Sequence, residues 1–197
     1  DDKANGIQNI YYESGNVSIE TPYTDDKKNG IQRKYDESGN VFCETTYTDG
    51  KENGIHRHYN KSGKVKSETP YTDDKKNGIQ KDYDWRGGLS METTYTDGKK
   101  NGIQKDYDYE SGKLKSETPY TDDKRNGIQK EYYPSGKLEF ETPFTDGKIN
   151  GIKRYYNERG KVKSETPYTD GEATYSKSRS IDIWGGIATG LQITNAA

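Results

Sequence analysis

The motif Asn-Gly-Ile recurs seven times in this 197-residue chain, at an almost constant interval. It begins at residues 5, 29, 53, 77, 101, 126 and 150, so the interval is 24 residues with a single 25. A fixed period of this length is typical of repeat proteins, in which each unit completes its core only against its neighbours. We number each repeat from its Asn as repeat position 1 and omit the one extra residue of the fifth repeat.

Inside each repeat the apolar residues alternate with polar ones. Repeat position 3 is always Ile, position 7 is always Tyr, position 13 is Val or Leu, and position 19 is aromatic. A period of two is the period of a strand, because successive side chains of a strand point to opposite faces. The pattern therefore predicts two strands per repeat, with positions 3, 5 and 7 on the same face as positions 13, 15, 17 and 19.

A turn signal separates the two strands of each repeat. Position 11 is Gly in all seven repeats, as in Glu13-Ser14-Gly15 and Pro134-Ser135-Gly136. A three-residue hairpin loop needs a positive φ at its last residue, where Gly is least strained. The signal predicts a hairpin in which position 7 pairs with 13, position 5 with 15 and position 3 with 17. The extra residue of the fifth repeat is expected to enlarge the turn at 109–112.

The junction between repeats is rich in turn-forming residues. Position 18 is Pro in five repeats and Thr in two, and a Thr-Asp-(Asp/Gly)-Lys segment follows it. Because Pro cannot donate to a strand ladder, we expect position 18 at a strand margin or bulge. The predicted fold is all-β: an elongated single-layer antiparallel meander of seven hairpin repeats at 1–172. Residues 173–197 would form a C-terminal cap or the start of a following segment, with a hairpin at 180–193 that covers the last strand edge.

The composition fits such a sheet and excludes several classes of protein. Only 26% of the residues are hydrophobic, yet 31 basic and 33 acidic residues nearly cancel to a net charge of −2. This balance argues against a nucleic-acid partner, which would need a basic excess. No apolar run is long enough for a membrane-spanning helix, and the single Cys43 excludes an internal disulfide. So small an interior offers no dry pocket, and we predict no enzyme activity and no cofactor.

The units resemble a known repeat family. The run from Asn126 to Leu138, followed by Phe144-Thr145-Asp146-Gly147-Lys148, is similar to bacterial MORN-type repeats, in the variant found in YwqK-family antitoxin proteins. The resemblance covers residues 1–172, and Gly-Ile replaces the usual Gly-x-Trp/Tyr opening. It implies a single-layer antiparallel sheet that acts as a scaffold.

The aromatic rows are the candidate interaction face. They have two interpretations: a packing core with hydroxyls that reach water, or an open face that captures a partner. The fourteen residues are Tyr11, Tyr23, Tyr35, Tyr47, Tyr59, Tyr71, Tyr83, Tyr95, Tyr107, Tyr120, Tyr132, Phe144, Tyr156 and Tyr168. The invariant Glu of position 16 is expected on the opposite face, and the basic residue of position 5 on the aromatic face.

Two patterns in the sequence resemble metal-binding motifs, but each has a simpler explanation. His56 and His58 share one strand face, yet no carboxylate or Cys cluster adjoins them in sequence, so surface decoration is the preferred interpretation. The Asp-x-Lys-x-Asn-Gly junctions resemble a calcium loop, but Lys stands at a ligand position and the closing Glu is missing. We therefore predict no metal site.

The sequence favours a non-enzymatic scaffold or surface spacer that presents an extended face to a protein partner. Self-association through sheet edges is a further expectation. The alternative is an antitoxin-like protein that neutralises a partner toxin. The chain begins at a repeat junction without an initiator Met, so we expect a segment of a longer protein. Its location stays open between the bacterial cell surface or exterior and the cytoplasm.

Overall fold

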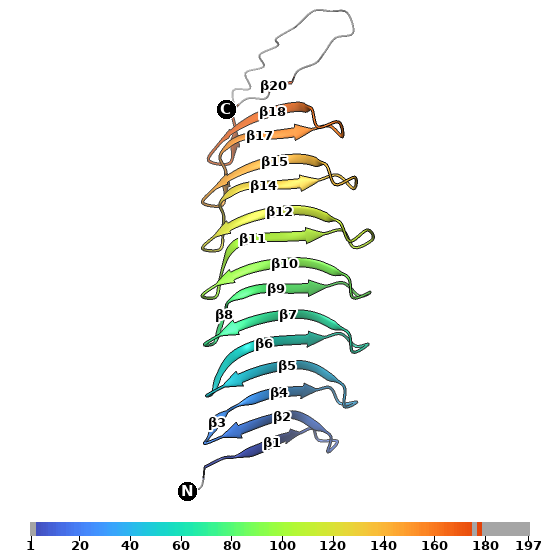
Figure 1. Ribbon diagram of the computed structural model, residues 1–197, viewed down its shortest axis with the longest axis vertical. Helices are drawn as coiled ribbons and strands as arrows, with labels where there is room; N and C mark the ends of the chain where they lie inside the picture. Colours follow the sequence, from blue (N-terminus) through green and yellow to red (C-terminus); the bar gives the residue numbers. More distant parts are fainter. Residues whose placement is uncertain (1–2, 175–176, 179–197) are drawn as a thin grey trace, which may run out of the picture. The chain divides into compact units, whose positions relative to one another are not determined.

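The computed structural model describes residues 3–174 and 177–178. It divides into two compact units, residues 1–100 and 101–197, which we describe separately. The described residues form strands and turns without a helix, and in each unit successive hairpins make a single-layer antiparallel sheet (Figure 1). The predicted all-β meander is confirmed. In this part of the chain there is no helix of the length and apolar character needed to cross a membrane.

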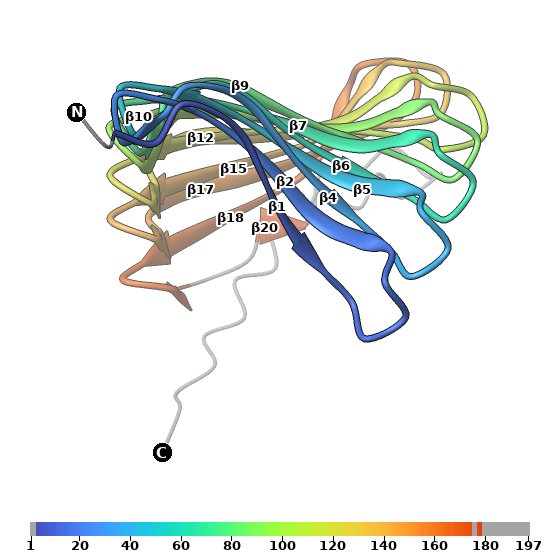
Figure 2. The ribbon, with the colours of Figure 1, turned by 90° about the horizontal axis from the view of Figure 1, so that it is seen from below.

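The first unit contains four hairpins, β1–β2, β4–β5, β6–β7 and β9–β10, and two short strands at the junctions. The strand bounds are β1 Gly6–Tyr11, β2 Val17–Thr24, β3 Lys27–Lys28, β4 Gly30–Tyr35, β5 Val41–Thr48, β6 Lys51–Tyr59, β7 Val65–Thr72, β8 Lys75–Lys76, β9 Gly78–Tyr83 and β10 Leu89–Thr96. Viewed along the stack of hairpins, the strands curve and the turns project beyond the sheet (Figure 2).

The second unit contains three hairpins, β11–β12, β14–β15 and β17–β18, and four short strands. Its strand bounds are β11 Lys99–Tyr107, β12 Leu114–Thr121, β13 Lys124–Arg125, β14 Gly127–Tyr132, β15 Leu138–Thr145, β16 Lys148–Ile149, β17 Gly151–Tyr156, β18 Val162–Thr169, β19 Glu172–Ala173 and β20 Lys177–Ser178. The last two short strands both pair with β18.

The hairpin turns form as the glycine pattern predicts. In the first repeat Tyr12 N–H donates to Asn16 O at 2.8 Å, Gly15 N–H donates to Tyr12 O at 3.0 Å, and Gly15 has φ +87°. In the fifth repeat Gly112 N–H donates to Asp108 O across one more residue, so the inserted residue enlarges this turn. Both predictions about the turns are confirmed.

The junction turns use two residues of positive φ. Asp25 and Asp26 have φ of 50° and 67°, and Asp49 and Gly50 have φ of 52° and 88°. Two successive left-handed residues are the mark of a type I′ turn, whose twist matches that of the flanking strands. The junctions therefore reverse the chain between repeats, and the turn chemistry explains them without a calcium ion.

The predicted strand pairing is correct at the turn and wrong beyond it. In the second repeat Tyr35 pairs with Val41 as expected, but Arg33 pairs with Glu44 and Ile31 with Thr46. The cause is a β-bulge at repeat position 14, which places one extra residue in the second strand and shifts all later pairs by one. The bulge recurs in every hairpin of both units.

The bulge decides which residues share a face. Directly opposite residues lie on the same side of a sheet, so positions 3, 5, 7, 13, 16 and 18 form one face. Positions 2, 4, 6, 15, 17 and 19 form the other. We call these the isoleucine face, after position 3, and the threonine face, after position 17. The predictions that position 19 shares a face with position 7, and that the position-16 Glu does not, are both wrong.

Position 18 controls the strand that follows it. After each of the five Pro residues the next strand is broken into a two-residue piece and a longer piece, whereas it is continuous in β6 and β11, which follow Thr46 and Thr94. Pro22 O accepts from Asn29 N at 2.9 Å at such a break. Pro22 is thus tolerated because the ladder to the following strand is interrupted there. On its other side, Pro22 pairs with Ile7 of β1. The β-bulge lies at position 14 and not at position 18.

The division between a repeat array at 1–172 and a cap at 173–197 stays a prediction. Strands β19 and β20 continue the pairing beyond the last hairpin. The expected capping hairpin at 180–193 lies outside the described residues.

Candidate functional site

The isoleucine face carries a polar network that links consecutive repeats. Arg33 Nε lies 3.0 Å from Glu44 of its own repeat, and Arg33 Nη1 lies 3.3 Å from Glu20 of the repeat before it. Tyr59 of the third repeat donates its hydroxyl to Glu44 at 2.6 Å. Glu44 thus accepts hydrogen bonds from residues of two repeats. The same Tyr–Glu contact joins Tyr83 to Glu68, Tyr132 to Glu117 and Tyr156 to Glu141.

The network shifts the pKa values of the Glu and Tyr side chains that form it. The hydrogen bond from Tyr59 and the bond from Arg33 hold the pKa of Glu44 below its ordinary value of 4.5, and Arg57 does the same for Glu68. Burial and the hydrogen bond to Glu44 raise the pKa of Tyr59 to about 12. These carboxylates are therefore ionised at neutral pH and the phenols are neutral, which is the state in which the network forms.

A row of exposed isoleucines runs beside this network. Six of the seven position-3 side chains are between 39% and 64% exposed: Ile7, Ile31, Ile79, Ile103, Ile128 and Ile152. Single exposed apolar residues are ordinary, but a row repeated at one position on one face within each unit makes an apolar stripe. In the second, third and seventh repeats the Arg of position 5 next to this stripe pairs with the Glu of position 16.

The threonine face is more closely packed. The position-17 side chains Thr21, Thr45, Thr69, Thr93, Thr118 and Thr142 are between 2% and 6% exposed. Gln32 is buried with them and donates to Thr21 Oγ1 at 2.8 Å. Basic side chains lie over aromatic rings of this face, such as Lys28 Nζ at 4.7 Å from the ring of Tyr47. Because the threonines are small, the longer basic and aromatic side chains around them can contact one another over the sheet.

The structure divides the fourteen aromatic candidates between the two faces. The isoleucine face has the position-7 residues Tyr11, Tyr35, Tyr59, Tyr83, Tyr107, Tyr132 and Tyr156. The threonine face has the position-19 residues Tyr23, Tyr47, Tyr71, Tyr95, Tyr120, Phe144 and Tyr168. Apart from exposed Tyr11 and buried Phe144, all are half-buried, so they pack and remain accessible at once.

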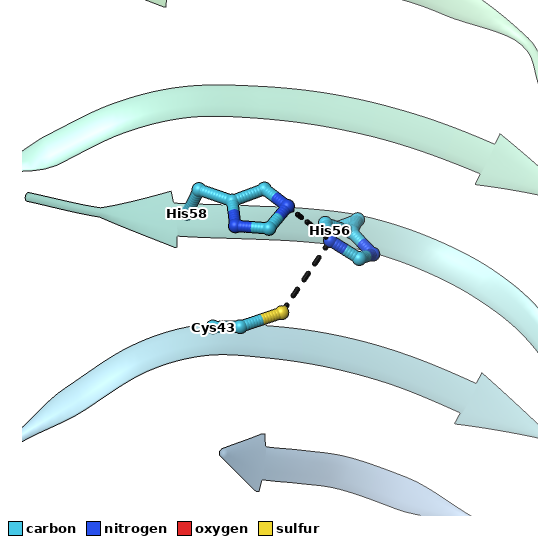
Figure 3. A group of neighbouring side chains, drawn as sticks. All are labelled: Cys43, His56 and His58. Atoms are coloured by element: carbon cyan, nitrogen blue, oxygen red, sulfur yellow. Dashed lines mark hydrogen bonds between the residues drawn. The ribbon is translucent and has the colours of Figure 1, made fainter. Parts of the chain in front are cut away.

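A second candidate site lies on the threonine face of the first unit (Figure 3). Cys43 on β5 pairs directly with His58 on β6, and His56 lies two residues from His58 on the same side. Cys43 Sγ is 3.4 Å from His56 Nε2, and His56 Nε2 is 3.0 Å from His58 Nε2. One ligand atom from each of the three residues lies within 4.8 Å of the others. The His pair was expected to be isolated decoration, but the structure adds a cysteine to it.

The surroundings of this cluster differ from those of a reactive thiol. Cys43 is 3% exposed, and burial raises the pKa of its thiol. Burial lowers the pKa of His56, and partial desolvation with the nearby charges of Lys66 and Lys34 lowers the pKa of the exposed His58, so both imidazoles are neutral at pH 7 and have lone pairs available. His56 Nδ1 lies 3.2 Å from Thr45 Oγ1, which fixes the orientation of the ring. The arrangement favours coordination chemistry over nucleophilic attack.

The register explains why sequence analysis missed this cluster. Cys43 precedes His56 by thirteen positions and lies in a different hairpin, and the pairing expected from the turn alone puts the two residues on opposite faces of the sheet. The direct pair between Cys43 and His58 forms across the junction, between the second strand of one repeat and the first strand of the next. The available signal was that both histidines and the single cysteine fall in adjacent repeats.

The fold and its network define a class of protein: a β-hairpin repeat protein whose units are joined through their side chains. The sequence matches the MORN repeat variant at residues 4–25, 28–49, 52–73, 100–122, 125–146 and 149–170. The chain therefore belongs to the MORN repeat variant family, as the resemblance implied, and it is a repeat-based module of the binding or scaffold kind. Modules of this family are generally non-enzymatic. No curated protein matches the chain.

The matched segments do not include the fourth repeat, yet the structure forms the same hairpin there. Strands β9 and β10 pair with the same bulge as the others, and Tyr83 pairs with Leu89. This repeat has Trp85-Arg86-Gly87-Gly88 at its turn, where the other repeats have Asn or Lys after the turn glycine. The turn sequence differs, but the geometry is retained.

Proposed function

We propose that this chain is a non-enzymatic scaffold that binds a protein partner through its isoleucine face. The observation that carries the proposal is the row of exposed isoleucines at repeat position 3. An exposed apolar stripe bordered by polar residues is typical of an interaction surface. The position-7 tyrosine rings, which are half-buried beside the isoleucines except for the exposed Tyr11, complete the apolar part of the surface.

The chemistry of the face indicates what the partner should offer. The Arg and Glu side chains satisfy one another, as in the pair of Arg57 Nε and Glu68 at 2.7 Å. In the second, third and seventh repeats the face therefore carries neutralised ion pairs, and the net charge of the chain is only −2, so charge alone would not steer a partner strongly. The expected partner is a protein segment whose apolar side chains contact successive isoleucines.

A matched pair of substitutions on β1 tests which face binds. Ile7 and Ile10 lie on the same strand, are 64% and 59% exposed, and belong to the isoleucine and threonine faces respectively. Proteins crosslinked to the chain in its source cells would be identified and purified, and their binding to Ile7→Lys and Ile10→Lys variants measured by titration calorimetry. We expect Ile7→Lys to weaken binding and Ile10→Lys to leave it unchanged.

Substitutions in two further repeats extend the test. Adding Ile31→Lys and Ile79→Lys to Ile7→Lys should abolish binding, while folding, followed by circular dichroism, stays intact because all three side chains are exposed. A partner that binds the triple variant as tightly as the native chain would contradict the proposal. If a bound partner were a toxin, restored growth of cells that produce it would identify the antitoxin-like role. Sedimentation velocity at several concentrations would detect the other expected interaction, self-association through the sheet edges.

A further inference from the structure

We propose that Cys43, His56 and His58 form a binding site for a first-row divalent transition-metal ion of the zinc type. The proposal concerns the threonine face and does not depend on the proposed function of the isoleucine face. Thiolate sulfur and imidazole nitrogen are the ligands that Zn²⁺ prefers in proteins. The chain has one cysteine and two histidines in 197 residues, and the structure brings all three together.

The distances suit a shared metal ion. In a tetrahedral site with bonds of ~2.0–2.1 Å to nitrogen and ~2.3 Å to sulfur, two nitrogens lie ~3.3 Å apart and nitrogen and sulfur ~3.6 Å. The corresponding separations here are 3.0 Å between the two Nε2 atoms and 3.4 Å between His56 Nε2 and Cys43 Sγ. The third separation is within 4.8 Å. Small side-chain rotations would therefore bring all three atoms to one ion, with a fourth position left for water or an external ligand.

The groups around the ligands support this arrangement. When His56 Nε2 binds the ion, its ring proton lies on Nδ1, where Thr45 Oγ1 at 3.2 Å accepts it. Such an outer contact orients the imidazole and strengthens it as a ligand. Binding displaces the proton of the Cys43 thiol to solvent, so the thiolate carries one negative charge against the two positive charges of the ion. His58 is exposed and gives the ion a route from solvent.

Next to the cluster, the residue at repeat position 24 also differs in charge from its equivalents in the other repeats. This position is basic in four repeats (Lys28, Lys76, Lys100 and Arg125) and uncharged in the last two (Ile149 and Ala173), but it is the carboxylate Glu52 in the repeat that contains Cys43. Glu52 pairs with Tyr47 on the threonine face and accepts its hydroxyl hydrogen bond at 3.4 Å. A carboxylate in place of a cation lowers the local positive potential that Lys34 and Lys76 create. The exception thus favours a cation at this place.

The repeats supply substitutions that their own fold accepts. Ser67 occupies the position of Cys43 in the next repeat, and Gln32 and Lys34 occupy the positions of His56 and His58 in the repeat before. The test uses the reduced full chain, freed of metal by chelator, with Co²⁺ and then Zn²⁺ as probes. We expect one equivalent of Co²⁺ to bind with a thiolate-to-cobalt charge-transfer band and one equivalent of Zn²⁺ to displace it.

The variants locate the ligands. Cys43→Ser should remove the charge-transfer band, and His56→Gln and His58→Lys should each weaken Zn²⁺ by more than the ~10–100-fold that loss of an outer-shell partner costs. Glu52→Lys should weaken Zn²⁺ by on the order of tenfold and keep the band. Ser67→Ala is the matched control and should bind as the native chain does. Binding without one-to-one saturation, a band that survives Cys43→Ser, or an equal loss in Ser67→Ala would overturn the proposal.

Discussion

The two faces of the sheet are built from the same strands but differ in how strictly they repeat. On the isoleucine face, positions 3, 7 and 16 are Ile, Tyr and Glu in all seven repeats. On the threonine face, position 17 is invariant, while position 15 is Ile, Cys, Ser, Met, Ser, Phe and Ser in turn. Strict repetition on one face and local variety on the other require a physical reason.

The contacts provide that reason. Glu44 accepts from Arg33 of its own repeat and from Tyr59 of the next, so a change at any one of these positions affects two repeats. The threonine face instead packs through a layer of small buried threonines, above which the residues of positions 4, 6 and 15 can differ. The repeated face can serve a partner that contacts many repeats, whereas the variable face can hold a single site such as the Cys43 cluster.

Acidification should have the largest effect, because it acts on the Glu network of several repeats at once. The pKa of Glu44 and of Glu68 is held below 4.5, so their stabilisation is fully present above that value and is lost as pH falls through the lower folded-state pKa. We expect the free energy of unfolding, measured with urea between pH 6 and pH 3, to fall by ~3 kcal/mol.

The control for this prediction removes the two histidines, whose protonation would overlap that of the carboxylates. The histidines are replaced as His56→Gln and His58→Lys, because their own lowered pKa would add to the loss of stability in acid. In that background Glu68→Gln should flatten the pH dependence below pH 4.5. An unchanged slope would show that this carboxylate does not stabilise the isoleucine face.

Two substitutions at the same position of the threonine face should have opposite effects. Thr21 Oγ1 accepts a hydrogen bond from buried Gln32, whereas Thr142 Oγ1 is buried without a hydrogen-bond partner among the described residues. Thr21→Val would leave the Gln32 amide unsatisfied and cost ~1–3 kcal/mol, whereas Thr142→Val should be neutral or stabilise by up to ~1 kcal/mol. Urea unfolding of both variants measures the difference. Equal losses would mean that position 17 acts through shape alone.

Much of the fold follows from short-range chemistry that the sequence displays. Gly15 and its equivalents predict the hairpins, and Asp25-Asp26 predicts the junction turns, because each needs a positive φ within a few residues. The bulge at position 14 has no such local signal: Ser18, Phe42 and Lys66 share no property that demands it. One inserted residue reverses the facing of everything beyond it. Sequence reasoning therefore found the strands but assigned Glu20 and Tyr23 to the wrong faces.

The candidate sites depend on this same shift. With the pairing expected from the turn, Glu44 would point away from Tyr59, and the network between repeats could not be anticipated. The pair between Cys43 and His58 spans a junction, where position 15 pairs with position 6 of the next repeat whether Pro or Thr stands at position 18. Side-chain partners across strands could not be assigned until that register was known.

The smallest effect is expected from single tyrosine hydroxyls, and it tests whether the isoleucine-face network joins repeats. Tyr59 donates to Glu44 of the preceding repeat at 2.6 Å, whereas Tyr11 has the same position in the first repeat, where no earlier Glu adjoins it among the described residues. Tyr59→Phe should therefore cost ~1 kcal/mol in the free energy of unfolding, and Tyr11→Phe less than ~0.5 kcal/mol.

Alkaline titration gives the same comparison a second readout. The pKa of Tyr59 is raised to about 12, above the ordinary value of 10.0, so its stabilising bond persists up to pH 10 and is lost as pH rises toward 12. In the native chain, the phenolate absorbance of Tyr59 should therefore appear only as pH approaches 12. It is identified as the part of the titration curve that the Tyr59→Phe variant lacks. If Tyr59→Phe and Tyr11→Phe cost the same, the hydroxyl bonds do not couple the repeats. The invariance of position 7 would then be explained by ring packing against Val and Leu of position 13.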